Sequence, residues 1–289
     1  MTLRIFSHRV EYPISFSNKV KSSSVKTARF KEQTKPNYGH PLENGTVNRR
    51  KTLITFILTI LMGFILFILP NLFFGISKIN GGLIGINLLF IALFQLFAVV
   101  LLVFYSLKIL KKDFRYIGWS FENWQKDTLL GLAVGLGWTL LQFTILIPNT
   151  GGAERADIAG ILSMMDGTPL GLLSFIALGV IGGGITEEIF NRGYFINVLK
   201  DTFQNSKTGL WMAAILSILF FCLGHLPTNT IEWIDILVPT TAYTLLFIYT
   251  KRLTASIIAH GIYNMTGILM TYFMSVSYTH LTLPTIYSV

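Results

Sequence analysis

Seven long apolar runs, separated by short polar segments, dominate the chain. Most are close to the roughly 20 residues that an α-helix needs to cross a bilayer. A soluble protein with so many runs would expose large apolar surfaces. The pattern predicts an all-α, polytopic transmembrane bundle of about seven helices, or eight with an interfacial or re-entrant helix. The predicted helices are Thr52–Ile76, Gly82–Leu107, Thr128–Ile147, Pro169–Leu199, Leu210–Leu226, Trp233–Tyr249 and Leu253–Phe273.

Two segments depart from the pattern of simple spans and short loops. The fourth run is too long for one straight span, so we expect it to tilt or to continue as a helix beyond the bilayer. The segment Pro148–Thr168 is polar and carries three acidic residues, and we expect it to be an external loop with a short interfacial helix.

Basic residues are concentrated in one part of the chain. Residues 1–51 hold eleven Lys and Arg against three Asp and Glu, and they have no sustained apolar period. This composition is typical of a disordered tail. The tail is interpreted as a topology signal, with binding to anionic lipid as the alternative. No folded basic face that would bind nucleic acid is evident.

Counting Lys and Arg on alternate sides of the spans predicts the orientation. With the N-terminus inside, the inner side holds 21 basic residues and the outer side holds two, Lys78 and Arg155. We therefore expect an integral membrane protein with a cytoplasmic N-terminus, in a bacterial plasma membrane. Its parts would be a basic cytoplasmic tail (1–51), a transmembrane protease-like domain (52–274, with a family core at about 108–273) and a C-terminal stretch (275–289).

The C-terminal stretch Ser275–Val289 differs sharply in composition from the rest and resembles translated adapter sequence. We expect it not to be native, and His280 is therefore left out of every argument about the site.

Ionisable groups inside apolar runs cost roughly 2.5–3.5 kcal/mol each at a helix centre, so they are usually functional or paired. Glu187 and Glu188 are adjacent in the fourth run, directly after Gly182–Gly184. Arg192 follows Glu188 by four residues, which places the two on one helix face as a pair. Glu187 points elsewhere and lacks this partner. Such divided environments separate a working acid or base from a structural charge.

Two further spans carry polar groups. His225 ends the fifth run, where a packed histidine is as good an interpretation as a catalytic one. His260 and Asn264 share a face of the seventh, roughly 6 Å apart along the axis. They are suited to hold a developing oxyanion or to place a metal ligand beside its neighbour. Glu187 and His260 lie a short way along their helices from Lys200 and Lys251, which are assigned to the inner side. We therefore expect the site to lie in the cytoplasmic half of the membrane and to open inward.

Three motifs lie on separate helices in this order: Glu-Glu-x-x-x-Arg, Phe-x-x-x-His and His-x-x-x-Asn. Together they resemble the CPBP (CAAX protease and bacteriocin-processing, or Abi) family of intramembrane proteases. The resemblance covers about Lys108 to Phe273, and Gly118-Trp119 and Trp124 fit it. It implies a CAAX prenyl endopeptidase-like enzyme that hydrolyses a peptide bond of a membrane-associated peptide or protein. The oligomeric state stays open.

The resemblance also implies roles. Glu187 looks like the base that activates water, and His225 like its partner in orienting that water. Glu188 and Arg192 resemble the supporting pair, while His260 and Asn264 correspond to the residues that bind the scissile carbonyl oxygen. Members have been called metalloproteases, and Glu187, His225 and His260 are of the types that bind zinc. The residues leave zinc and metal-free chemistry open.

Two rival functions stay open. One is a non-enzymatic role in bacteriocin self-immunity or in regulation of membrane proteins, although such a role has no need of Glu187. The other is a transporter, which also uses buried Glu and His. A transporter of this kind would be expected to show internal repeats, and we find none.

Overall fold

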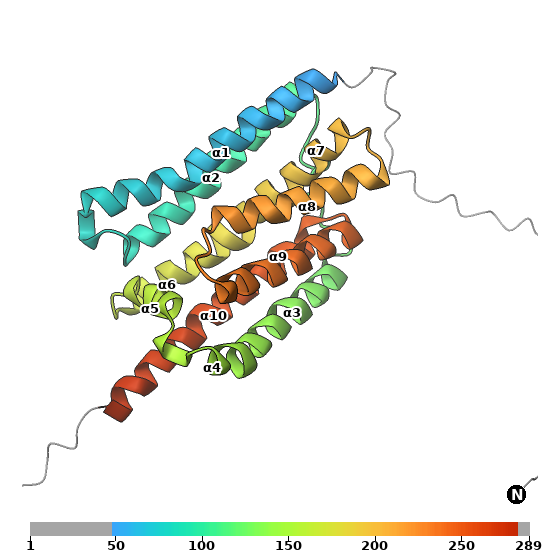
Figure 1. The fold of residues 1–289 in the computed structure, drawn as a ribbon. Coiled ribbons are helices and arrows are strands. Elements are labelled where there is room, and N and C mark those ends of the chain that lie inside the picture. The colour runs from blue at the N-terminus through green and yellow to red at the C-terminus, as the bar shows by residue number, and fades with distance from the viewer. Residues whose placement is uncertain (1–47, 283–289) are drawn as a thin grey trace, which may run out of the picture. The chain divides into compact units, whose positions relative to one another are not determined.

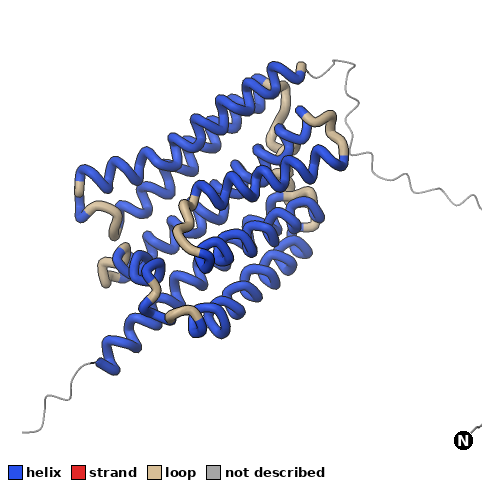
Figure 2. The backbone as a smooth tube through the Cα atoms, viewed as in Figure 1, coloured by secondary structure: helices blue, strands red, loops and turns tan. Residues whose placement is uncertain are grey.

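The structure, a computed structural model, describes the backbone of residues 48–282 and the side chains of residues 48–274. The described part consists of helices joined by short loops and turns, without a strand (Figure 2). The predicted tail and the predicted non-native stretch lie almost wholly outside the described side chains. Of the tail, only its last residues are described, where α1 begins at Arg49.

Among the described residues, seven helical segments are long and apolar enough to cross a membrane, which confirms the predicted bundle. Their ends lie within a few residues of those predicted. They are α1 (Arg49–Ser77), α2 (Ile86–Ile109), α3 with its continuation (Trp124–Asn149), the composite fourth span (Pro169–Thr202), α8 (Lys207–Gly224), α9 (Thr230–Thr250) and α10 (Leu253–Thr282, with Leu253–Met274 as the candidate span).

Short elements occupy the loops. A single turn, η1 (Ile79–Gly81), links α1 to α2, and α3 (Trp124–Leu141) continues through η2 (Gln142–Leu146) into α4 (Ile147–Asn149). The predicted external loop then contains η3 (Gly152–Glu154) and a helix of two turns, α5 (Ala156–Ser163). The short helix expected in this loop is therefore present.

The fourth span is a continuous helix with a π-helical middle. It comprises α6 (Pro169–Ala177), η4 (Leu178–Glu187), η5 (Ile189–Ile196) and α7 (Asn197–Thr202). Thr168 caps its start by accepting a hydrogen bond from the amide of Gly171, as a preferred N-cap residue does. In the π segment the Thr186 hydroxyl donates to the carbonyl of Ile181, five residues back, at 2.7 Å. π-Helical turns are rare and occur often at functional sites.

Helix α10 is held closely against α3. A Cβ added to Gly131 or Gly135 would lie only 2.6 or 2.5 Å from the carbonyl oxygen of Ala255 or Ala259, so only glycine allows this approach. Small residues let membrane helices pack backbone to backbone in this way. The ion pair between Arg252 and the fully buried Asp127, at 2.6 Å, ties the first turns of both helices together. These contacts fix α10, which carries the third motif.

The hairpin α1–α2 lies along one side of the bundle and α3 along the other (Figure 1). A chain of hydroxyl groups attaches the hairpin to the fourth span: Thr59 bonds Ser106 at 2.9 Å, and Ser106 bonds Tyr194 at 2.6 Å. Large apolar side chains such as Leu58 and Phe97 face outward. Such an exterior suits lipid rather than water, because lipid imposes no cost on exposed apolar surface.

Candidate active site

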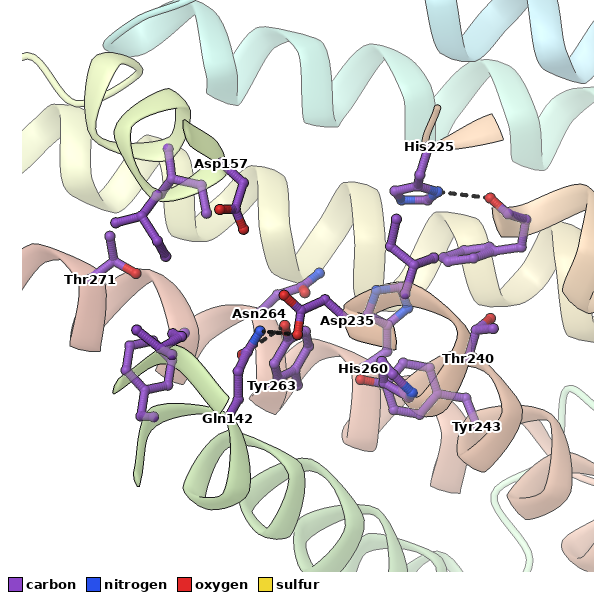
Figure 3. Close-up of a pocket in the computed structure, with 18 residues that line it drawn as sticks. Gln142, Asp157, His225, Asp235, Thr240, Tyr243, His260, Tyr263, Asn264 and Thr271 are labelled. Atoms are coloured by element: carbon purple, nitrogen blue, oxygen red, sulfur yellow. Dashed lines mark hydrogen bonds between the residues drawn. The ribbon is translucent and has the colours of Figure 1, made fainter. Parts of the chain in front are cut away.

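The polar residues predicted from three separate helices come together around one cavity of 270 Å³, here called the Glu187 cavity. Glu187, His225, His260 and Asn264 all contribute to its lining. A second cavity of 220 Å³, here called the Tyr243 cavity, shares three of these residues and is drawn in Figure 3. The Glu187 cavity is lined by Asn71, Gln95, Leu178, Gly182, Gly183, Glu187, His225, His260 and Asn264. The shared residues are His225, His260 and Asn264.

Glu188 lies on the buried side of this arrangement. Its Oε1 accepts contacts from Arg192 at 2.8 Å and from His260 Nδ1 at 2.9 Å, and all three side chains are at most 7% exposed. The predicted pair of Glu188 and Arg192 is therefore present. Glu188 also contacts His260 of α10 and orients its imidazole, a contact that the spacing within one helix did not predict.

This contact constrains the proton on His260. Glu188 beside Arg192 is a carboxylate, so Nδ1 of His260 must donate a hydrogen to it. Nε2 then carries a lone pair in the neutral ring and a hydrogen only in the imidazolium. Such carboxylate–histidine contacts fix ring orientation and tautomer in metal and catalytic sites. Nε2 is the nitrogen that faces Gly183 and the cavity.

His225 is the first residue after α8, and its exposed side chain lines both cavities. Its Nδ1 lies 2.9 Å from the carbonyl oxygen of Phe221, one turn earlier. A carbonyl only accepts, so Nδ1 carries the hydrogen and the neutral ring presents the lone pair of Nε2. The ring also packs on Phe221, with centroids 4.4 Å apart. The sequence left a packed and a catalytic His225 equally open, and its side chain lines the same cavity as the others.

Asn264 is held against the fourth span. Its side-chain amide donates to the carbonyl of Gly179 at 2.9 Å, which uses one of its two N–H groups. A Cβ on Gly183 would lie 2.4 Å from the Asn264 amide nitrogen and 3.5 Å from Nε2 of His260. Gly183 is therefore needed for α10 to bring both polar groups to the cavity. Gly184, by contrast, serves helix packing, because its missing side chain admits the backbone of Gly261.

Glu187 differs from its neighbour. Among the described residues its carboxylate has no ion-pair or hydrogen-bond partner, and its Oε2 is buried. Glu188 Oε2 is also buried without a hydrogen-bond partner, but Glu188 Oε1 is contacted by Arg192 and His260. A buried carboxylate oxygen with no partner is costly and is a typical feature of a site that binds something. The predicted contrast between an unpaired Glu187 and a paired Glu188 is thus what the structure has.

Three residues of the Glu187 cavity are of types that bind metal ions. Glu187, His225 and His260 all reach the Glu187 cavity, and both histidines present Nε2. Within residues 48–274, however, the arrangement contains no group of three His, Cys, Asp or Glu side chains close enough to share an ion. In this arrangement Glu187, His225 and His260 are not close enough together to share one ion, and zinc binding stays a prediction.

The lining of the Tyr243 cavity shows toward which end of the bundle it extends, while the inward opening of the site stays a prediction. The Tyr243 cavity is lined by Ile147 of α4 and by Asp157 and Ile158 of α5, so it extends toward the end of the bundle opposite to Arg49. The sequence argument placed the opening at the same end as Arg49. Rise along a helix gives the depth of a residue, but the packing of α4 and α5 decides where the cavity leads, and that packing left no pattern in the sequence.

Several residues of the site were missed. On α9, Thr240 accepts a hydrogen bond from the Arg192 guanidinium, and Tyr243 stacks on His260. Asp235, on the same helix, also lines the Tyr243 cavity. Intramembrane carboxylates are a usable signal, whereas Tyr and Thr in an apolar run are too common to stand out.

Asp235 belongs to a polar network at the far end of the Tyr243 cavity. It accepts hydrogen bonds from Gln142, at 3.1 Å, and from Arg155, which also binds both carboxylate oxygens of Asp157. Burial acts to lower the pKa of Arg155, but the bonds to Asp157 and Asp235 outweigh it and raise the pKa above its ordinary value. Arg155 therefore remains charged and links α5 to α9.

The hairpin α1–α2 also reaches the site. Asn71 and Gln95 both donate their side-chain amides to the carbonyl of Phe67, at 2.8 and 3.0 Å, and both line the Glu187 cavity. With the nitrogens engaged there, their amide oxygens remain as acceptors. Neither residue lies in the stretch that the family resemblance covered.

Comparison with known proteins adds to this geometry. Residues 169–266 match the family described as type II CAAX prenyl endopeptidase Rce1-like. The range contains all seven motif residues from Glu187 to Asn264. No curated protein and no solved structure matches the chain. The apolar helices and the family match together indicate an integral membrane protein that acts as a protease. The match over the segment that carries the three motifs confirms the resemblance to the CPBP family of CAAX-type intramembrane proteases.

Proposed function

We propose that the protein is an intramembrane endopeptidase that hydrolyses a peptide bond of a membrane-associated substrate by direct attack of water. The observation that carries this proposal is the convergence of Glu187, His225, His260 and Asn264 on one cavity, with a buried and unpaired oxygen on Glu187. Glu188 Oε2 is also buried without a hydrogen-bond partner, but Glu188 is held through Oε1 by Arg192 and His260. The carboxylate of Glu187, by contrast, has no partner among the described residues. A general base needs such an unengaged carboxylate, because it must accept a proton there.

In the proposed reaction, a water molecule lies between Glu187 and Nε2 of His225, both of which accept hydrogen bonds. Glu187 takes a proton from the water as the water oxygen attacks the scissile carbonyl carbon. The resulting tetrahedral intermediate collapses when the C–N bond breaks, and Glu187 returns the proton to the departing amine. Water is consumed, and the products are a new carboxylate and a new amine.

The carbonyl oxygen becomes negatively charged during attack and needs donors aimed at it. Asn264 retains one N–H group after its bond to Gly179. His260 donates from Nε2 only as the imidazolium, for which the carboxylate of Glu188 is a suitable counter-charge. Metal-free chemistry with His260 as a donor therefore requires the protonated ring, whereas a zinc ligand must be neutral.

The lining of the Tyr243 cavity favours an apolar substrate segment. Phe143, Ile147, Ile158, Ile161 and Ile236 contribute apolar walls next to the shared polar residues. Ligand sites are usually of this kind, mostly apolar with a few polar groups that fix orientation. A C-terminal or membrane-adjacent peptide with apolar side chains fits this description, and the presence of a prenyl group is not required by it.

The test is cleavage of a library of apolar peptides by the purified protein in lipid. Wild type is compared with Glu187→Ala, each with and without a zinc chelator and across pH. Loss of cleavage in the variant alone, with no effect of the chelator, supports the metal-free reaction. Loss with the chelator as well supports zinc.

The alternative, a role in bacteriocin self-immunity or regulation without proteolysis, has no observation of its own in its favour. If wild type cleaves no peptide under any condition while folded in lipid, the proposed protease activity is wrong and this alternative takes its place.

A further inference from the structure

Tyr243 of α9 combines deep burial with an unused polar group. Its side chain is 2% exposed, and its hydroxyl has no hydrogen-bond partner among the described residues. The ring lies parallel to the imidazole of His260, with centroids 4.9 Å apart and planes 21° apart. Tyr243 lines the same cavity as His225, His260 and Asn264 (Figure 3).

Other tyrosines of the bundle show that this is unusual. The hydroxyl of Tyr194 lies 2.6 Å from Ser106, that of Tyr116 donates to the carbonyl of Asn197, and that of Tyr263 donates to Gln142. Buried tyrosine hydroxyls generally find a partner in this way. Leaving one without a partner is unfavourable in the free protein, so a partner supplied by a bound molecule would explain why the hydroxyl is there.

With His260 in its neutral form, the carbonyl oxygen of a substrate has one donor at this site. Asn264 offers one N–H group, since the other bonds Gly179. In its neutral form His260 offers none, because Nδ1 is engaged by Glu188 and Nε2 carries a lone pair. Two donors are the usual minimum for an oxyanion hole. Tyr243, whose ring stacks on that of His260 and lines the same cavity, carries a hydroxyl that could be the second.

We propose that Tyr243 is a catalytic residue whose hydroxyl donates a hydrogen bond to the scissile carbonyl oxygen, beside Asn264. The bond strengthens as negative charge develops on that oxygen, and the proton stays on tyrosine throughout. The role rests on the proposed protease activity and supplies a donor that the three sequence motifs do not contain.

The surroundings of Tyr243 hold the ring in place for this role. One face stacks on His260, and the guanidinium of Arg192 lies 5.8 Å from the ring centroid. Arg192 is itself bonded to Thr240, one turn earlier on α9. The ring is therefore fixed by the same buried network that orients His260, which gives the preorganisation that such a donor requires.

The test is Tyr243→Phe, which keeps the ring and its stacking and removes only the hydroxyl. We expect kcat to fall by about 10²–10³-fold, the usual loss for one oxyanion donor, with KM changed little. The thermal unfolding temperature in lipid or detergent should stay the same or rise, because the variant no longer buries an unpaired hydroxyl.

The matched control is Tyr194→Phe, which removes a buried hydroxyl that is bonded to Ser106 and lies in neither cavity. We expect a lower unfolding temperature and a kcat per folded molecule within about threefold of wild type, because its hydrogen bond is structural.

The outcomes separate the two proposals. If wild type cleaves peptides and Tyr243→Phe does so within threefold of its rate, the role of Tyr243 is wrong and the protease activity stands. If Tyr243→Phe loses activity only in proportion to a loss of folded protein, the residue is structural and the role is again wrong. If wild type cleaves nothing, the protease activity fails and the role of Tyr243 fails with it.

Discussion

Glu187 and Glu188 are neighbours in the chain with the same chemistry, yet they face two different regions of the molecule. Glu188 faces a closed region, where Arg192 and His260 both contact its Oε1. Glu187 faces a cavity of 270 Å³ and has a buried oxygen without a partner among residues 48–274. The two carboxylates therefore point from the fourth helix into different surroundings, Glu188 as a structural charge and Glu187 as a reactive one.

The difference shows how a membrane site manages charge. A charge in a closed region is tolerated when it is paired and hydrogen-bonded, and Glu188 uses its pairing to orient His260. A charge that is meant to take a proton must instead stay unpaired. The predictions below test whether these two regions have the separate roles that their contacts indicate.

The largest effect is expected from Glu187→Gln. This change keeps the shape of the side chain and removes the base, so cleavage should fall by about 10³-fold or more. The unfolding temperature should not fall, because the lost charge had no partner. The measurement is single-turnover cleavage beside thermal unfolding, with wild type as the reference. Cleavage within tenfold of wild type would show that another group takes the proton.

A large effect on stability is expected from Arg192→Ala. The change leaves the buried carboxylate of Glu188 without its guanidinium, and breaking such a pair costs about 3–5 kcal/mol. Folded yield in detergent and the midpoint of denaturant unfolding are the measurements. The partly exposed pair of Lys112 and Asp201 at 3.6 Å provides the control: Lys112→Ala should cost less than about 1 kcal/mol. Equal losses of unfolding free energy in the two variants would show that the region around Glu188 is not closed.

A smaller effect, on activity, is expected from Gly183→Ala. The new methyl would meet the Asn264 amide at 2.4 Å, so α10 must move away from the fourth helix. Because small displacements of catalytic groups are costly, we expect cleavage to fall by about 10–100-fold. Gly137→Ala on α3 is the control, since its Cβ would meet no atom within 4 Å. If both variants keep wild-type activity, the close approach at Gly183 has no role in catalysis.

The smallest effect is expected from Gln95→Met. The variant keeps the length of the side chain but loses its amide, which donates to Phe67 and offers an oxygen to the Glu187 cavity. If that oxygen binds substrate, KM should rise by about 3–10-fold, which corresponds to roughly one hydrogen bond. Thr59→Val is the control, because it breaks the α1–α2 contact with Ser106 away from both cavities. A KM equal to that of wild type would limit the role of the hairpin to packing.

The fold and the core of the site were predictable from the sequence for a physical reason. The bilayer requires long apolar helices, so all seven spans were visible as runs. An ionisable group inside such a run is rare, so Glu187, Glu188, His225 and His260 stood out individually. Helix spacing then paired Glu188 with Arg192, and the structure has that pair at 2.8 Å.

Other features could not be predicted because they depend on contacts between helices. The bond from Glu188 to His260 joins the fourth span to α10, and no spacing within one helix predicts it. The π-helical stretch around Glu187 keeps an ordinary apolar pattern. Tyr243 and Gln95 are residues that apolar runs often contain, and only the unpaired hydroxyl and the cavity distinguish them. The cytoplasmic orientation of the N-terminus stays a prediction.

The central claim is that the two adjacent carboxylates have separate roles, and one measurement tests it most directly. Glu187→Gln and Glu188→Gln are reconstituted in the same lipid, and cleavage of one apolar peptide is measured per folded molecule. We predict a folded Glu187→Gln without detectable cleavage, and a Glu188→Gln with less folded protein that still cleaves at about 1–10% of the wild-type rate, because it keeps the base and loses only the orientation of His260. Cleavage by Glu187→Gln, or its complete loss in a well-folded Glu188→Gln, would contradict the assignment.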